Sequence, residues 1–155
     1  LQIVGAGPEE KKLKNLAQSF GIASDISFVG HVEPAWVLHY LREADIFARP
    51  SRSEGLGSSF LEAMAVGLPV IGTRVGGIPD FLKDPAEAGV GGATGLFAEA
   101  ENPASVAEKI ALLVKNAEVR KKIGDNGRKL VEKSYMWNGI ATHMSKIFAQ
   151  LTSHF

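Results

Sequence analysis

Short runs rich in β-branched residues alternate with longer segments of helical periodicity along this 155-residue chain. The β-rich runs cover residues 2–4, 26–29, 46–48, 70–72 and 96–98, and the helical patterns cover 9–20, a segment that starts at Pro34, 60–66, 104–115, 118–133 and 138–151. Strands that alternate with helices pair in parallel, with helices on both faces of the sheet. The pattern predicts an α/β domain with a doubly wound, Rossmann-like parallel sheet and a helical C-terminal end.

Composition excludes several classes of protein. Hydrophobic residues make up 45% of the chain, enough to build a core, and a formal net charge of zero argues against nucleic-acid binding. The chain has no cysteine, which excludes a disulfide framework and a thiolate metal site and is compatible with a cytoplasmic location. No apolar run approaches the roughly 20 residues that span a bilayer.

The segment 50–67, PSRSEGLGSSFLEAMAVG, has the character of a ligand site. Glu54 and Glu62 stand on either side of seven residues in which a loop of glycines and serines runs into an apolar helix. Glycine lets main-chain amides approach a ligand closely, and the N-terminus of a helix attracts anions. A carboxylate at each end suits a ligand with an anionic middle and hydroxyls at both extremities, and a nucleoside diphosphate sugar has that layout.

The same residues have structural interpretations. Ser59 followed three positions later by Glu62 is the pattern of a capping box, in which Glu62 would bind a backbone N–H. Glu54 has a structural alternative too: a charged side chain of a surface loop that is solvated by water and binds no ligand. A glycine-rich loop before a helix is by itself a weak signal.

The whole stretch resembles the donor-site segment of the family four (group one) retaining glycosyltransferases, which have the GT-B fold. The matching residues are Pro50, Ser51, Glu54, Gly55, Leu56, Gly57, Glu62, Ala63, Met64, Ala65, Gly67, Pro69 and Val70, with Leu56 in place of the usual aromatic residue. The likeness continues in residues 3–8, 76–79 and 94–96 and at Trp137, so it covers essentially the whole chain.

The resemblance implies a role for each candidate residue. Glu62 would hold the ribose hydroxyls of the donor, and Glu54 would contact the transferred sugar and stabilise charge at its anomeric carbon. The main chain would supply the other contacts, from Gly55, Leu56, Gly57 and Ser58 to the sugar or phosphates, from Gly5 at the end of the first strand, and from Gly30, His31 and Val32 to the nucleobase. Such enzymes react on the front face of the sugar, so no protein base is required. The absence of an Asp-x-Asp motif and of a histidine cluster agrees with a metal-independent reaction without a cofactor.

The resemblance also implies a larger enzyme. Residues 1–155 correspond to a donor-binding domain that lacks its first strand–helix unit, with that unit's phosphate-binding arginine and lysine, and the N-terminal domain that binds a sugar, lipid or other acceptor. We therefore expect the chain alone to be inactive and any peripheral membrane association to depend on the missing part. Arg49 and Arg52 are candidates to replace the missing cations.

Two other functions stay open at this point. The glycine turn after the first strand favours a nicotinamide-binding oxidoreductase domain, but the full fingerprint is missing, and Val29 and Gly30 stand where an acidic residue is expected. A non-catalytic sugar-nucleotide-binding module is the second alternative.

Three structural expectations follow from the same pattern. In the strand order 3-2-1-4-5-6, the strands at 2–4 and 46–48 would flank the missing central strand and would not pair with each other. Residues 80–95 read as a long surface loop. The stripe Ile140, Met144, Ile147, Phe148 and Leu151 on the last helix should be partly exposed.

Overall fold

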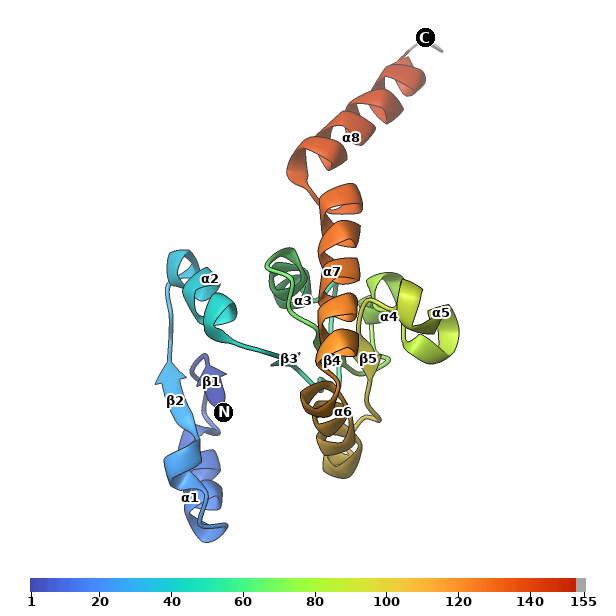
Figure 1. The fold of residues 1–155 in the computed structure, drawn as a ribbon. Coiled ribbons are helices and arrows are strands. Elements are labelled where there is room, and N and C mark those ends of the chain that lie inside the picture. Colours follow the sequence, from blue (N-terminus) through green and yellow to red (C-terminus); the bar gives the residue numbers. More distant parts are fainter. Residues whose placement is uncertain (153–155) are drawn as a thin grey trace. The chain divides into compact units, whose positions relative to one another are not determined.

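The computed structural model of the chain describes residues 1–152 (Figure 1). The chain forms two compact units, of which the first is Leu1–Tyr40 and the second begins at Leu41. The strands form a two-stranded and a three-stranded sheet, and all ladders between named strands are parallel. The structure is therefore of the α/β class.

In the first unit, strand β1 lies beside strand β2, and helices follow each of them. The elements are β1 (Gln2–Val4), α1 (Glu10–Ser19), the 3-10 turn η1 (Ala23–Asp25), β2 (Ser27–Gly30) and α2 (Pro34–Glu43), whose last three residues lie in the second unit. Ala17 is the buried residue of α1. On the same helix, Nζ of Lys14 lies 2.6 Å from the Glu10 carboxylate one turn earlier and forms an ion pair with it. The 3-10 turn was not predicted from the sequence.

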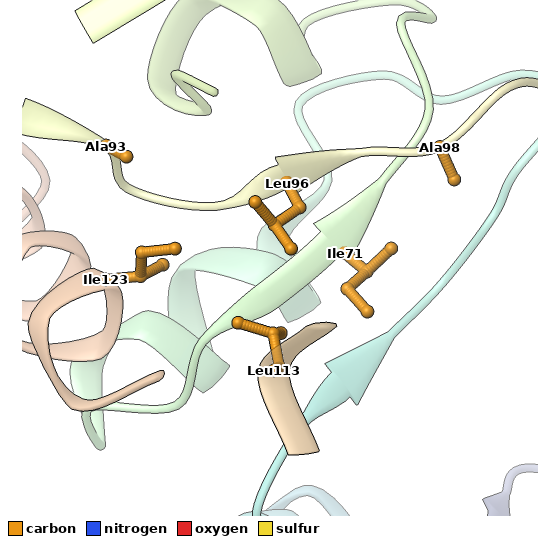
Figure 2. Close-up of a cluster of buried hydrophobic side chains, with 6 residues drawn as sticks. All are labelled: Ile71, Ala93, Leu96, Ala98, Leu113 and Ile123. Carbon is orange, nitrogen blue, oxygen red and sulfur yellow. The ribbon is translucent and has the colours of Figure 1, made fainter. Parts of the chain in front are cut away.

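In the second unit, β3 (Phe47–Ala48), β4 (Val70–Gly72) and β5 (Leu96–Phe97) pair in that order, with β4 in the centre. Ile71 of β4 faces a cluster that includes Leu113 of helix α6 (Figure 2). A Cβ built on the next residue, Gly72, would lie 3.0 Å from the Phe60 ring of helix α3. Successive residues of a strand point to opposite faces, so α3 and α6 cover opposite faces of this sheet.

The helices of the second unit are α3 (Ser58–Ala65), α4 (Ile78–Phe81), α5 (Pro85–Gly92), α6 (Pro103–Lys115), α7 (Ala117–Ser134) and α8 (Trp137–Thr152). The long helix α7 packs against α3, α5 and α6 (Figure 1). Ile123 of α7 joins Leu113 of α6 and Leu96 of β5 in the cluster of Figure 2. These contacts fix α3 on the sheet.

Most predicted elements are confirmed within one or two residues, but the interpretation of residues 80–95 as a surface loop is wrong. The segment contains helix α5, which begins with Pro85 after Asp84 and has a kink at Gly89. Asp84 caps this helix, because its side chain accepts a hydrogen bond from the Ala86 N–H at 2.9 Å. Asn126 of α7 secures its end by donating from Nδ2 to the carbonyls of Val90, Gly91 and Ala93.

The strand pairing agrees with the expected order. Among residues 1–152, β1 and β3 belong to different sheets, and each pairs with the neighbour that the order 3-2-1-4-5-6 assigns to it. The exposed stripe on α8 is also confirmed, since Ile140, Met144, Ile147, Phe148 and Leu151 are 36% to 61% exposed.

Candidate functional site

The loop that carries Glu54 leaves the carboxyl end of β3 and leads into α3. Its start continues the sheet, because the Arg49 N–H donates to the Ile71 carbonyl of β4 at 3.0 Å. The Thr73 hydroxyl, fully buried just beyond β4, donates to the Ser51 carbonyl. Two contacts from one neighbouring strand thus fix the direction in which the loop leaves the sheet edge, where α/β proteins bind ligands.

A second loop supports the first from the side. The Gly77 N–H donates to the Gly55 carbonyl at 2.8 Å, and Gly76 beside it has a φ of +52°, which favours glycine. The two loops meet backbone to backbone. The segment 50–57 is therefore positioned by tertiary contacts and not only by its own turns.

Glu54 lies at the centre of a polar network. Its Oε1 lies 2.8 Å from Nη2 of Arg49 and accepts a hydrogen bond from the Ser51 hydroxyl at 2.9 Å. Nη1 of Arg49 donates to the Ser59 hydroxyl on α3 at 2.7 Å. Only 10% of the Glu54 side chain is exposed. The interpretation of Glu54 as a freely solvated loop charge is therefore wrong.

A row of backbone donors follows Glu54. Across residues 1–152, no group accepts a hydrogen bond from the N–H groups of Gly55, Leu56, Gly57 or Ser58. Gly57 is the N-cap of α3 and has a φ of +75°, so it needs to be glycine, whereas Gly55 has no positive φ and open space where a Cβ would stand. Of the two glycines, only Gly57 uses a backbone angle that other residues resist. Free N–H groups at the start of a helix are a ready anion site.

The structure contains no capping box formed by Ser59 and Glu62. Helix α3 begins at Ser58 with Gly57 as its N-cap, so Ser59 is its second residue and its hydroxyl bonds to Arg49. Glu62 is exposed, and its carboxylate has no hydrogen bond or ion pair within the described part of the chain. It lies one turn along the helix from Ser58 and Ser59, and is free to bind a ligand.

The two arginines expected near the phosphates have protein partners. Arg49 is bound to Glu54 and Ser59, and Nε of Arg52 lies 2.8 Å from Oε1 of Glu101. Arg52 and Glu101 are mostly exposed, so this ion pair adds little to stability.

The remaining candidates belong to the first unit. The Gly5 N–H donates to the Gly30 carbonyl at 2.8 Å, which joins the carboxyl ends of β1 and β2. His31 is exposed and lies 3.7 Å from the Glu33 carboxylate, while Val32 is half-buried. A hollow at the end of β1 has Gly5 in its lining, together with Ile3, Val4 and Phe28.

The residues of the first 152 positions include no group of three or more histidine, cysteine, aspartate or glutamate side chains arranged to hold a metal ion. The same part of the chain has no helix whose length and apolar character would let it cross a bilayer.

Sequence reasoning missed three supports of the site: Thr73, the Arg49–Ser59 contact and the backbone contact of Gly77 with Gly55. The motif at 76–79 was recognised, but nothing in it indicates which backbone it touches. The sequence does show that Thr73 directly follows an apolar strand, where a hydroxyl is expected to be buried. A buried hydroxyl needs a hydrogen-bond partner, and Thr73 is fully buried in the structure.

A parallel α/β sheet with unbonded N–H groups at a helix start and a carboxylate on either side of them places the chain among α/β proteins with a candidate ligand site at the carboxyl edge of the sheet. The family model of the glycosyl transferases group 1 matches residues 1–130, and the chain belongs to this family. It is 34% identical to an uncharacterized glycosyltransferase of Methanocaldococcus jannaschii over 97% of the chain and 40% of that protein. It is 32% identical to a GDP-mannose-dependent phosphatidylinositol monomannoside mannosyltransferase of Mycobacterium tuberculosis over 94% of the chain and 38% of that protein.

Solved structures agree on the fold. HepE of Anabaena, solved in complex with UDP, matches with a TM-score of 0.85 and 19% identity, over 96% of the chain and 40% of that protein. The fold is that of GT-B glycosyltransferases. The chain spans 40% or less of the length of the curated relatives named above.

Proposed function

We propose that the chain is the donor-binding domain of a retaining glycosyltransferase that transfers a hexose from a nucleoside diphosphate sugar to an acceptor. The observation that carries the proposal is the row of free N–H groups from Gly55 to Ser58, which lies between a held carboxylate, Glu54, and an unbonded one, Glu62. Anionic phosphates fit the N–H groups, and hydroxyls fit the carboxylates.

Each end of the donor has its own partner in this proposal. Glu62 binds the ribose hydroxyls, and its exposed carboxylate needs no rearrangement to do so. Glu54 accepts a hydrogen bond from a hydroxyl of the transferred sugar and stabilises positive charge at the anomeric carbon as the diphosphate leaves. The N–H groups of the loop stabilise the negative charge that develops on the departing phosphate. Gly5, Gly30, His31 and Val32 contribute to the nucleobase subsite, mostly through main-chain atoms.

The reaction needs no metal and no cofactor in this proposal, and the leaving phosphate takes the proton of the acceptor. The acceptor, a sugar, a lipid or another hydroxyl compound, is bound by a part of the enzyme outside residues 1–155, and we expect this chain alone to be inactive. A cytoplasmic location fits the nucleotide-sugar donor. The names of similar proteins support a nucleotide-linked donor, since one relative is GDP-mannose-dependent and HepE was solved with UDP.

Calorimetric titration of UDP, GDP, ADP and NAD into the full-length protein tests the proposal. We expect one nucleoside diphosphate to bind and NAD not to bind. Binding of NAD alone would favour the oxidoreductase alternative, and binding of none would remove the proposed function.

Two further measurements separate its finer parts. Following the anomeric proton of the product by NMR during transfer distinguishes retention from inversion. Addition of EDTA should leave the transfer rate unchanged, because the proposed electrostatic stabilisation comes from protein N–H groups; loss of the rate on EDTA and recovery with Mg²⁺ would contradict metal independence.

A further inference from the structure

Arg49 connects the end of β3 with the first turn of α3, across the loop that carries Glu54. One nitrogen of its guanidinium, Nη2, faces the Glu54 carboxylate at 2.8 Å, and the other, Nη1, donates to the Ser59 hydroxyl at 2.7 Å. Its backbone is fixed by the bond from its N–H to Ile71. The planar guanidinium is thus anchored at two points on a side chain whose backbone is also fixed, so its direction is defined.

An ion pair and a hydrogen bond meet at the same oxygen of Glu54. Nη2 of Arg49 lies 2.8 Å from Oε1, and the Ser51 hydroxyl donates to Oε1 at 2.9 Å. Within residues 1–152, Oε2 accepts no hydrogen bond. A carboxylate that is held at one oxygen by an ion pair and a hydrogen bond is restricted in orientation, and its second oxygen keeps its capacity to accept hydrogen bonds.

The difference in exposure between the partners shows which of them needs the other. The Glu54 side chain is 10% exposed, whereas that of Arg49 is 50% exposed. A carboxylate removed from water requires a charged or hydrogen-bonding partner, but an arginine at half exposure is solvated without one. The ion pair therefore serves to hold Glu54 in place.

We infer that Arg49 is a positioning residue and not a ligand of the phosphates of the nucleotide sugar. It orients Glu54 so that Oε2 accepts a hydrogen bond from a hydroxyl of the transferred sugar. The inference rests on the proposed function. It predicts that Arg49 contributes to the affinity for the sugar part of the ligand and not to the affinity for the nucleotide part.

The test compares two ligands that differ only in the sugar. Calorimetry on the full-length protein would measure Kd for a nucleotide sugar and for its nucleoside diphosphate, using UDP-glucose with UDP, GDP-mannose with GDP or ADP-glucose with ADP, whichever pair the wild type binds. In Arg49→Gln we expect the affinity for the nucleotide sugar to fall about tenfold, because Glu54 loses the charged partner that orients it toward the sugar. The affinity for the nucleoside diphosphate, which has no sugar for Glu54 to bind, should change less than about twofold. Arg49→Lys should recover part of the loss, since it keeps the charge beside Glu54 but lacks the fork that also reaches Ser59.

Arg128→Gln is the matched control, because Arg128 forms an exposed ion pair with Glu132 on α7 at 2.9 Å. It should leave both affinities unchanged. If Arg49→Gln does not fold, Ser59→Ala removes an anchor of Arg49 without changing any charge and should weaken only nucleotide-sugar binding.

Equal loss of both ligands in a folded Arg49 variant would make Arg49 a phosphate ligand and overturn the inference. Unchanged binding of both ligands would overturn it as well. If the wild type binds no member of these three pairs, the proposed function itself fails, and this result differs from both of the others.

Discussion

Gly76 lies against the main-chain carbonyl of Glu54, so closely that a Cβ built on Gly76 would stand 1.8 Å from that oxygen. The neighbouring Gly77 N–H donates to the Gly55 carbonyl. The loop after β4 therefore sets the position of the backbone that carries Glu54 and the free N–H groups. The family motif at residues 76–79 acts here as a support of the site.

Replacing Gly76 with alanine should destabilise the protein by about 3 kcal/mol or more, because the new Cβ overlaps a backbone atom and the φ of +52° is strained for any L side chain. Thermal unfolding measures the loss. Gly139→Ala is the control: it has open space in helix α8, and alanine there should stabilise the helix slightly. Equal unfolding temperatures for Gly76→Ala and the wild type would contradict the close contact.

Replacing Glu62 with glutamine should lower the affinity for the nucleoside diphosphate by about 2 kcal/mol or more, a factor of about 30 upward, because two charge-assisted hydrogen bonds to the ribose are weakened. The unfolding temperature should barely move, since the carboxylate has no partner within the described residues. Calorimetry and thermal unfolding of the full-length protein measure the two effects. Glu118→Gln, a change at an exposed glutamate in the first turn of α7, should leave the affinity unchanged. A loss of stability that matches the loss of affinity would mean that Glu62 has a structural role.

Replacing Asn126 with alanine should free the end of α5. The three carbonyls that accept from its Nδ2, those of Val90, Gly91 and Ala93, would lose their donor, at a cost of about 1 to 3 kcal/mol. We expect faster proteolysis and faster hydrogen exchange within residues 85–92. Asn138→Ala, at the start of α8, is the control and should change neither. Unchanged exchange in α5 of the Asn126 variant would show that other contacts hold this helix.

The exposed stripe of α8 should make the 155-residue chain self-associate when it is prepared by itself. Met144 is 46% and Ile147 is 41% exposed, on the same face of the helix as Leu151 at 61%. Contiguous apolar surface of this kind favours association in water. In sedimentation velocity, the double substitution Met144→Gln and Ile147→Gln should lower the associated fraction, and Lys146→Gln between them should not. A wild-type chain that remains a monomer at every concentration would contradict the expectation.

The sequence by itself determined the class of fold, the strands and most of the helices, because apolar periodicity and the positions of glycine and proline are local properties. It also located the loop with Glu54 and the helix with Glu62, since the spacing of these residues is carried by a continuous segment. The fold class and the family were confirmed by the structure and the comparisons. The neighbours within each of the two sheets agreed because doubly wound sheets of this class share a common strand order.

Only the tertiary structure decided how the site residues are held. Ser59 could cap a helix or bind another side chain, and Arg49, ten positions earlier, competes successfully for its hydroxyl. The sequence could not show that one oxygen of Glu54 is held and the other is free, because this depends on where Arg49 and Ser51 meet the carboxylate in space. The contact of Gly76 with Glu54 joins residues on two different loops, and such long-range contacts leave no periodic trace in the sequence.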